Sequence, residues 1–126
     1  MIDIIKNKVL IIDDEEAILI LLSVVLKKEG FVNVKTINNS IDSINLCKLY
    51  EPDIIILDIM MPNMDGFDVL REIRKFTIVP ILFLSAKSEE TDKLLGFGIG
   101  ADDYITKPFS PKEVALRIKA HLRRIK

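Results

Sequence analysis

The sequence predicts an α/β fold, a doubly wound parallel sheet of five strands with five helices covering both of its faces. Strand and helix signals alternate five times along the 126 residues, and the connections between them are short. Several strand candidates are also continuous apolar runs, as expected for parallel strands that are buried on both faces. Alternating strands and helices with short connections imply right-handed crossovers and a parallel sheet.

The expected strands lie at residues 8–12, 33–37, 54–58, 80–84 and 103–106. The first is almost entirely apolar, and the third follows the helix-breaking pair Pro52-Asp53 with four apolar residues that lead into Asp58. The fourth is apolar up to Ser85, and the fifth ends at Lys107. Each strand is therefore bounded by turn signals or by a polar residue.

The expected helices lie at residues 16–29, 40–50, 66–75, 89–97 and 111–124. Gly30 follows the first of them as a C-cap glycine does. The last begins with a capping box from Ser110 to Glu113, with Pro111 at the first helical position. Pro62 and Gly66 shape the loop before the third helix and start that helix.

Composition places the chain among soluble single domains. Its hydrophobic fraction is 49%, its charged fraction 29% and its net charge −1, so nothing global indicates nucleic-acid binding. The short basic run from Arg123 to Lys126 suits a solvated helix end. A single cysteine, Cys47, cannot form an internal disulfide and is expected in the core, which favours a reducing, cytoplasmic location. No signal peptide or membrane span is expected, because the longest apolar stretch is about half a span.

Four strand ends carry the polar residues that point to chemistry. Asp13 and Asp14 follow the first strand, Asp58 ends the third, Ser85 follows the fourth and Lys107 follows the fifth. Open α/β sheets bind their ligands at the carboxyl ends of the strands. Three carboxylates, a hydroxyl and an ammonium at one edge would suit a divalent cation and a phosphoryl group.

Four motifs in this order, Asp13-Asp14, the segment 58–66, Ser85-Ala86 and Lys107-Pro108-Phe109, resemble the receiver domain of two-component response regulators. The resemblance covers residues 1–126 and implies a CheY-like (βα)5 fold with strand order 2-1-3-4-5. It implies that Asp58 accepts a phosphoryl group from a sensor histidine kinase, and that the domain catalyses only its own phosphorylation and dephosphorylation. The implied cofactor is Mg²⁺, held by Asp14, Asp58, the Met60 carbonyl and, through water, Asp13.

The resemblance also assigns roles around that centre. Lys107 would supply a charge and Ser85 a hydroxyl to the phosphoryl oxygens, and Tyr104 would be an aromatic switch that turns inward when Ser85 moves. The Lys107–Pro108 peptide would be cis, as in the family.

The segment from Asp92 to Tyr104 and the last helix resemble the OmpR/PhoB subfamily, whose active receivers dimerise through this face. A two-fold contact uses one patch twice. The implied pairs across the dimer are Lys93–Glu113, Asp103–Arg117 and Asp102–Arg124, around apolar Leu94, Phe97 and Leu116. Members of this subfamily usually bind DNA through a C-terminal winged-helix domain, which is missing from this chain, so that DNA and transcription control would be reached only in the full-length protein.

Each residue also has an alternative interpretation in which it serves structure alone. Asp13 and Asp14 could cap and begin a helix, and one of them could do both jobs. Asp58 could cap a turn, Ser85 could be a turn residue and Lys107 could be solvated. Tyr104 could simply pack with a hydrated hydroxyl, and the helices of the dimer face could be ordinary solvated surfaces. The lone histidine, His121, is expected to be exposed rather than catalytic.

Three other functions compete with a receiver that controls transcription. A free-standing phosphorelay or motor-control receiver would need no dimer. An aspartate-nucleophile phosphatase would need a second acid at Met60, two residues after Asp58, and a larger chain. A nucleotide-binding switch lacks both glycine-rich phosphate motifs.

The first helix is apolar on both sides. Positions 18, 22 and 25, with Leu21 and Leu26 beside them, are expected to face the sheet. Ile20 and Val24 lie about 200° from Leu22 and are expected to point away from the sheet, with Leu19 alongside. In the resembling family this helix docks against the kinase's helical bundle, so Ile20 and Val24 are hypothesised to contact the kinase, the alternative being that a neighbouring helix or molecule covers them.

Overall fold

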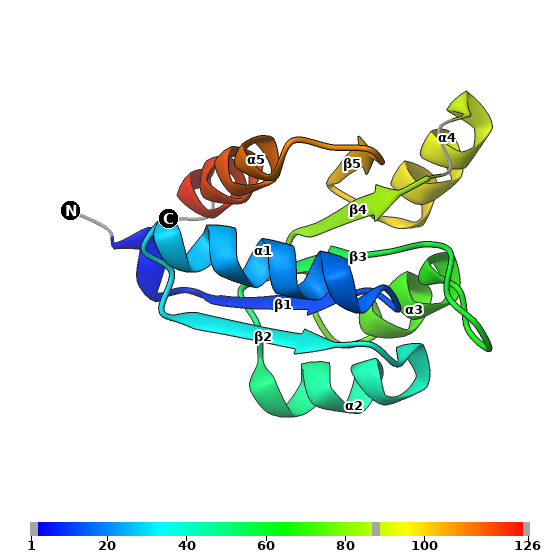
Figure 1. Cartoon of the computed structure of the whole chain (residues 1–126). Helices are drawn as coiled ribbons and strands as arrows, with labels where there is room; N and C mark the ends of the chain where they lie inside the picture. Colours follow the sequence, from blue (N-terminus) through cyan, green and yellow to red (C-terminus); the bar gives the residue numbers. More distant parts are fainter. Residues whose placement is uncertain (1–2, 87–88, 125–126) are drawn as a thin grey trace.

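The computed structural model describes residues 3–86 and 89–124. Five parallel strands form one sheet in the order β2-β1-β3-β4-β5 (Figure 1), which confirms the predicted fold class. The strands are β1 (Lys8–Ile12), β2 (Asn33–Ile37), β3 (Ile54–Leu57), β4 (Ile81–Ser85) and β5 (Asp103–Thr106). The helices are η1 (Ile4–Lys6), α1 (Glu16–Lys28), α2 (Ser40–Tyr50), α3 (Gly66–Ile73), α4 (Glu90–Ile99) and α5 (Pro111–Arg124).

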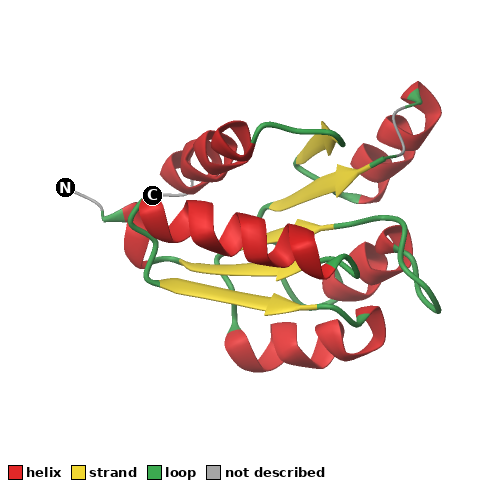
Figure 2. Ribbon diagram, in the orientation of Figure 1, coloured by secondary structure: helices red, strands yellow, loops and turns green. Residues whose placement is uncertain are grey.

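Helices cover both faces of the sheet, with α1 and α5 on one side and α2, α3 and α4 on the other (Figures 1 and 2). The alternation of side chains along β1 shows how the two cores divide. Val9 and Ile11 pack with α1 and α5, whereas Leu10 and Ile12 pack with α2 and α3. Every one of these side chains is buried, which is why the strand reads as a continuous apolar run.

Element ends differ from the prediction by one or two residues at several places. β4 extends to Ser85 because this residue pairs with Thr106 of β5, and the short helix η1 was not predicted. α4 continues to Ile99 and ends where Gly100 takes a φ of 124° and its N–H donates to the Gly96 carbonyl. Gly30 has a φ of 101°, which confirms its predicted role after α1.

The orientation of α1 was predicted only in part. Ile20 and Val24 are exposed, as expected, and Leu22 and Leu26 are buried. Leu19 was expected to point away from the sheet but is buried, and Leu21 was expected to face it but is exposed. The buried stripe therefore passes through 19, 22 and 26, a spacing of three and four residues that keeps one face inward.

The end of α1 is tied to α5 by Glu29, whose carboxylate accepts hydrogen bonds from Lys112 and Lys119, each at 2.7 Å. These two hydrogen bonds lower the pKa of Glu29 to about 2. Cys47 is buried, as predicted, and the Lys107–Pro108 peptide is cis. Within the described residues, no helix is long and apolar enough to cross a membrane.

Candidate functional site

The residues predicted from the strand ends do meet at one edge of the sheet. The Lys107 ammonium lies 3.1 Å from Asp13 Oδ2 and 3.7 Å from Asp58 Oδ2, although these residues follow β5, β1 and β3. Carboxylate oxygens of Asp13, Asp14 and Asp58 all lie within 4.8 Å of one another. The parallel sheet brings the three strand ends together because their carboxyl ends share one edge.

Backbone contacts fix Asp58 in this position. Its N–H donates to the Ile12 carbonyl at 2.9 Å, so the end of β3 is held against the end of β1. Gly66 begins α3 directly against the same turn, and its N–H donates to the Ile59 carbonyl at 2.8 Å. A Cβ at Gly66 would lie 2.4 Å from the Asp58 carbonyl oxygen, so no larger residue fits without moving the backbone that carries the carboxylate.

Two of the three carboxylates are deeply buried, and this changes their acidity. Asp13 and Asp58 are nearly inaccessible, whereas Asp14 is exposed. Burial, together with the charge of Asp13, raises the pKa of Asp58 to about 7, although Lys107 and the Met60 N–H oppose the rise. Burial also raises the pKa of Asp13. A hard divalent cation would relieve this repulsion, and its preferred ligands are the carboxylate and carbonyl oxygens present here.

The predicted alternative roles for Asp13 and Asp58 are also partly realised. Asp13 Oδ1 accepts a hydrogen bond from the Glu15 N–H at 2.9 Å, next to the start of α1. Asp58 Oδ1 accepts a longer one, 3.4 Å, from the Met60 N–H. Each of these carboxylates uses one oxygen to organise its local turn, while its Oδ2 is the atom nearest the Lys107 ammonium.

Glu15 was missed by the sequence analysis. Its Oε1 lies 3.0 Å from the Lys107 ammonium, as close as Asp13. Burial lowers the pKa of Lys107, but its hydrogen bond to the Glu15 carboxylate and the charges of Asp58 and Asp13 outweigh burial, so that the pKa of Lys107 is raised. The only signal in the sequence was the position of Glu15 directly after Asp13-Asp14, and an acid there equally suits a helix start.

Ser85 and Tyr104 lie beside this cluster. Ser85 is fully buried at the end of β4, and Tyr104 is buried among the side chains of the α2–α3–α4 face. The Tyr104 ring packs edge-on against Phe83 with centroids 5.8 Å apart. Burial and the charges of Asp92 and Asp58 raise the pKa of Tyr104 to about 12, while a hydrogen bond with Ser85 opposes the rise. The two side chains of the predicted switch are therefore in contact.

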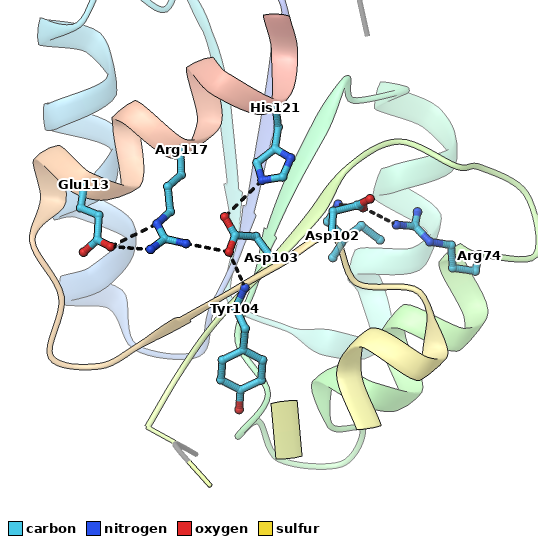
Figure 3. A network of polar contacts seen from close by, with 8 residues as sticks. Arg74, Asp102, Asp103, Tyr104, Glu113, Arg117 and His121 are labelled. Atoms are coloured by element: carbon cyan, nitrogen blue, oxygen red, sulfur yellow. Dashed lines mark hydrogen bonds and ion pairs between the residues drawn. The ribbon is translucent and has the colours of Figure 1, made fainter. Parts of the chain in front are cut away.

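The predicted dimer face carries a network of ion pairs within the chain (Figure 3). Arg117 donates to Asp103 Oδ1 at 2.7 Å and to Glu113 Oε2 at 2.9 Å. His121 Nε2 lies 3.1 Å from Asp103 Oδ2. His121 was expected to be exposed, but its side chain is only 12% accessible. It lies on the side of α5 that contacts Asp103 of β5.

Other members of the predicted face are similarly engaged. Asp102 Oδ2 accepts hydrogen bonds from Arg74 Nη2 and from the Ile81 N–H, each at 2.9 Å. The Lys93 ammonium lies 5.9 Å from the centre of the Tyr104 ring. The acids predicted to pair across a dimer thus have partners in their own chain. The exposed residues of this face include Leu94, Phe97, Leu116 and Arg124, and Asp102 is exposed despite its partners.

Comparison with known proteins gives consistent results. The family described as "Response regulator receiver domain" matches residues 9–119. The transcriptional regulatory protein YvrH of Bacillus subtilis is 48% identical over 116 residues, which are 92% of this chain and 49% of that protein. The chain thus spans about half the length of this relative.

Two solved structures share the fold closely. A two-component response regulator from Clostridium difficile has a TM-score of 0.91 at 28% identity, over 96% of this chain and 99% of that one. DrrB, an OmpR/PhoB homologue from Thermotoga maritima, has a TM-score of 0.86 at 32% identity, over 96% of this chain and 54% of that one.

Proposed function

This chain belongs to the response regulator receiver domain family, and on that premise we propose that it is a phosphorylation-activated switch that accepts a phosphoryl group on Asp58 from a sensor histidine kinase. The observation that carries this proposal is the position of Asp58, which is buried at the end of β3 beside Asp13 and the Lys107 ammonium. A structural aspartate would not need a buried carboxylate neighbour that raises its pKa.

In the proposed reaction, a carboxylate oxygen of Asp58 attacks phosphorus while the bond from phosphorus to the kinase's histidine nitrogen breaks, and the electron pair stays on that nitrogen. Lys107 and the Ser85 hydroxyl donate hydrogen bonds to the phosphoryl oxygens, and this charge neutralisation is the main requirement of phosphoryl transfer. Mg²⁺, when bound by Asp14, Asp58 and the Met60 carbonyl, with Asp13 acting through water, supplies further positive charge to the same oxygens.

Labelling with a small phosphodonor tests this function. Intact-mass measurement after incubation with acetyl phosphate and Mg²⁺ should show one added phosphoryl group in the wild type and none in Asp58→Ala. Omitting Mg²⁺ or adding a chelator should abolish labelling. Stoichiometric labelling separates a receiver from a phosphatase, which would turn over the donor instead. Undiminished labelling of Asp58→Ala would overturn the assignment.

We further propose that phosphorylation promotes a two-fold dimer through α4, β5 and α5. Exposed Leu94, Phe97 and Leu116 supply apolar surface, with Lys93, Asp102, Asp103, Glu113, Arg117 and Arg124 at its margin. Arg117 would have to exchange Asp103 of its own chain for the partner's, and the coupling of Tyr104 to Ser85 links this face to Asp58. Such pairs fix the register of the dimer more than its affinity.

Sedimentation with and without beryllofluoride, a phosphoryl mimic, tests the dimer. The mimic should shift the wild type toward dimer, and Arg117→Glu should block the shift. Arg123→Glu is the matched control, because Arg123 is an exposed arginine of the same helix outside the proposed face. Equal dimerisation of Arg117→Glu and wild type would show that the face is wrong.

Kinase recognition is proposed to involve Ile20 and Val24, which are 59% and 45% exposed on α1. Replacing both with lysine should slow transfer from the kinase and leave labelling by acetyl phosphate normal. Equal slowing of both routes would mean that the residues serve the fold. Since the chain spans about half of its transcription-regulator relative, we propose that the dimer controls transcription in the cytoplasm through a DNA-binding domain of the full-length protein.

A further inference from the structure

The Lys107 ammonium is shared among three carboxylates, and Glu15 is the closest of them. Its distances are 3.0 Å to Glu15 Oε1, 3.1 Å to Asp13 Oδ2 and 3.7 Å to Asp58 Oδ2. An ammonium has three N–H donors and no acceptor. Two donors are therefore within hydrogen-bond distance of Glu15 and Asp13, while Asp58 interacts with Lys107 only through its charge.

The ammonium lies 3.7 Å from Asp58 Oδ2, so a phosphoryl group on Asp58 would compete with Glu15 and Asp13 for it. The two existing hydrogen bonds differ in how easily they are released. Asp13 is buried, with a side chain only 2% accessible, whereas the Glu15 side chain is 59% accessible. A carboxylate that loses its partner in the interior keeps the full cost of its desolvation, but one at the surface is hydrated again. Glu15 is thus the partner that Lys107 can release at the lower cost.

Local structure gives Glu15 no competing role in the helix. Glu15 occupies the N-cap position of α1, yet its side chain accepts no cap hydrogen bond. Glu15 and Lys107 instead lie together on the wall of a groove of about 440 Å³ that Ile18, Leu21 and Phe109 also line. The contact to Lys107 is what orients the Glu15 carboxylate toward the acidic cluster.

We propose that Glu15 is a positioning residue that holds Lys107 in the resting protein and is exchanged for a phosphoryl oxygen when Asp58 is phosphorylated. The inference rests on the proposed function of Asp58 and deepens it. In the resting state the ion pair with Glu15 holds the Lys107 ammonium on the Glu15 side of the cluster. Breaking this ion pair is then part of the barrier to phosphorylation. Weakening the pair should therefore speed labelling by a small phosphodonor.

Three substitutions separate this role from simple charge repulsion. Glu15→Gln removes both the charge and the ion pair. Glu15→Asp keeps the charge, but the shorter side chain at an N-cap position favours hydrogen bonds to the backbone N–H groups of the first turn, away from Lys107. Glu16→Gln is the matched control, since Glu16 is the next exposed acid and contacts Asn38 rather than Lys107.

With acetyl phosphate and Mg²⁺, we expect the labelling rates of Glu15→Gln and Glu15→Asp to rise about two- to fivefold, the range that a partly exposed ion pair can supply. Glu16→Gln should label at the wild-type rate. If only Glu15→Gln is faster, repulsion of the anionic donor explains the effect and the positioning role is wrong. Unchanged or slower labelling of Glu15→Gln would overturn the role as well.

A measurement without metal or phosphodonor tests the contact itself. Urea unfolding of Glu15→Gln, Lys107→Met and the double variant forms a double-mutant cycle. We expect the two losses of stability to be non-additive, whereas the same cycle with Glu16→Gln should be additive. Additive losses with Glu15→Gln would overturn the inference while the function proposed for Asp58 stood. Failure of the wild type to label on Asp58 would instead overturn that function and, with it, the role of Glu15.

Discussion

Replacing the buried carboxylate of Asp58 with a neutral amide should make the metal-free protein more stable. Asp58 is 2% exposed, and its pKa rises from the ordinary value of 3.8 to about 7, first because of burial and then because of the charge of Asp13. Lys107 and the Met60 N–H favour the ionised form but do not offset burial. Asp58→Asn keeps the shape of the side chain and removes the charge.

The sign of this change in stability depends on which state of the protein, folded or unfolded, binds the proton of Asp58. Between the unfolded pKa near 3.8 and the folded pKa of about 7, Asp58 is protonated in the folded protein and ionised in the unfolded one. Folded proteins lose stability with rising pH wherever the folded state holds the extra proton. The contribution of Asp58 is therefore fully present below the unfolded pKa and is lost as the pH rises through the folded pKa.

The difference between the unfolded and folded pKa values of Asp58 sets the size of the change in stability. Each tenfold change in an acid dissociation constant corresponds to about 1.4 kcal/mol, so an interval from 3.8 to about 7 gives an upper limit of about 4 kcal/mol. We expect Asp58→Asn to exceed the wild type by about 1–4 kcal/mol in free energy of unfolding at about pH 8, and by much less at about pH 4. Because domains are stable by only about 5–15 kcal/mol, this difference is readily measured.

Urea unfolding in the presence of a chelator, followed by circular dichroism across this pH range, measures the effect. Asp42→Asn, at an exposed aspartate of α2, is the control and should change stability little at any pH. Adding Mg²⁺ should narrow the gap, because a cation bound only to the folded wild type stabilises it. An Asp58→Asn variant whose stability advantage does not grow between about pH 4 and about pH 8 would show that the pKa of Asp58 is not raised in the folded protein.

Two further predictions concern the contact between α1 and α5 and the packing of α4. Glu29→Gln should lower the melting temperature at neutral pH. Because the pKa of Glu29 is lowered from 4.5 to about 2 in the folded protein, its ionised carboxylate stabilises the fold above pH 4.5, and this stabilisation is lost as the pH falls toward about 2. The difference in melting temperature between variant and wild type should therefore disappear at low pH, and a difference that persists there would contradict this. Gly96→Ala should lose about 1–3 kcal/mol of stability, since its Cβ would lie 2.9 Å from the Phe83 ring. Gly98→Ala should gain about 0.5–1 kcal/mol of stability, because no atom lies within 4 Å of the added Cβ. If chemical denaturation ranks the two glycine variants in the opposite order, the packing described for α4 is wrong.

The strand ends could be predicted from sequence because the same physical constraint fixes both the strands and the site. A strand buried on both faces must be apolar throughout, so the first polar residue after the run 54–57 marks the point where the chain leaves the core. In a parallel sheet these points share one edge. The positions of Asp58, Asp13 and Lys107 therefore followed from the pattern, although the exact limits of β4 depended on its pairing with β5.

Contacts between side chains of different elements could not be predicted in the same way. The apolar residues of α1 outnumber those that one face can bury, and the sequence placed Leu19 and Leu21 on the wrong sides. His121 was expected in water because nothing local shows that α5 brings it to Asp103. Glu15 reaches Lys107 because the segment that follows β5 lines the same groove as the start of α1, a proximity that depends on tertiary packing.

The edge of the sheet that carries Asp58 holds buried like charges, which destabilise the folded protein. Two buried carboxylates share one lysine. α3 begins at Gly66, where a side chain would collide with the backbone of Asp58. An apolar residue in place of Asp58 would remove the repulsion from Asp13, so the requirements of folding alone do not account for the acid. A bound divalent cation would supply positive charge to the carboxylates that are in excess there. The repulsion that reduces the stability of the folded protein would thus be relieved by a cation bound to these carboxylates.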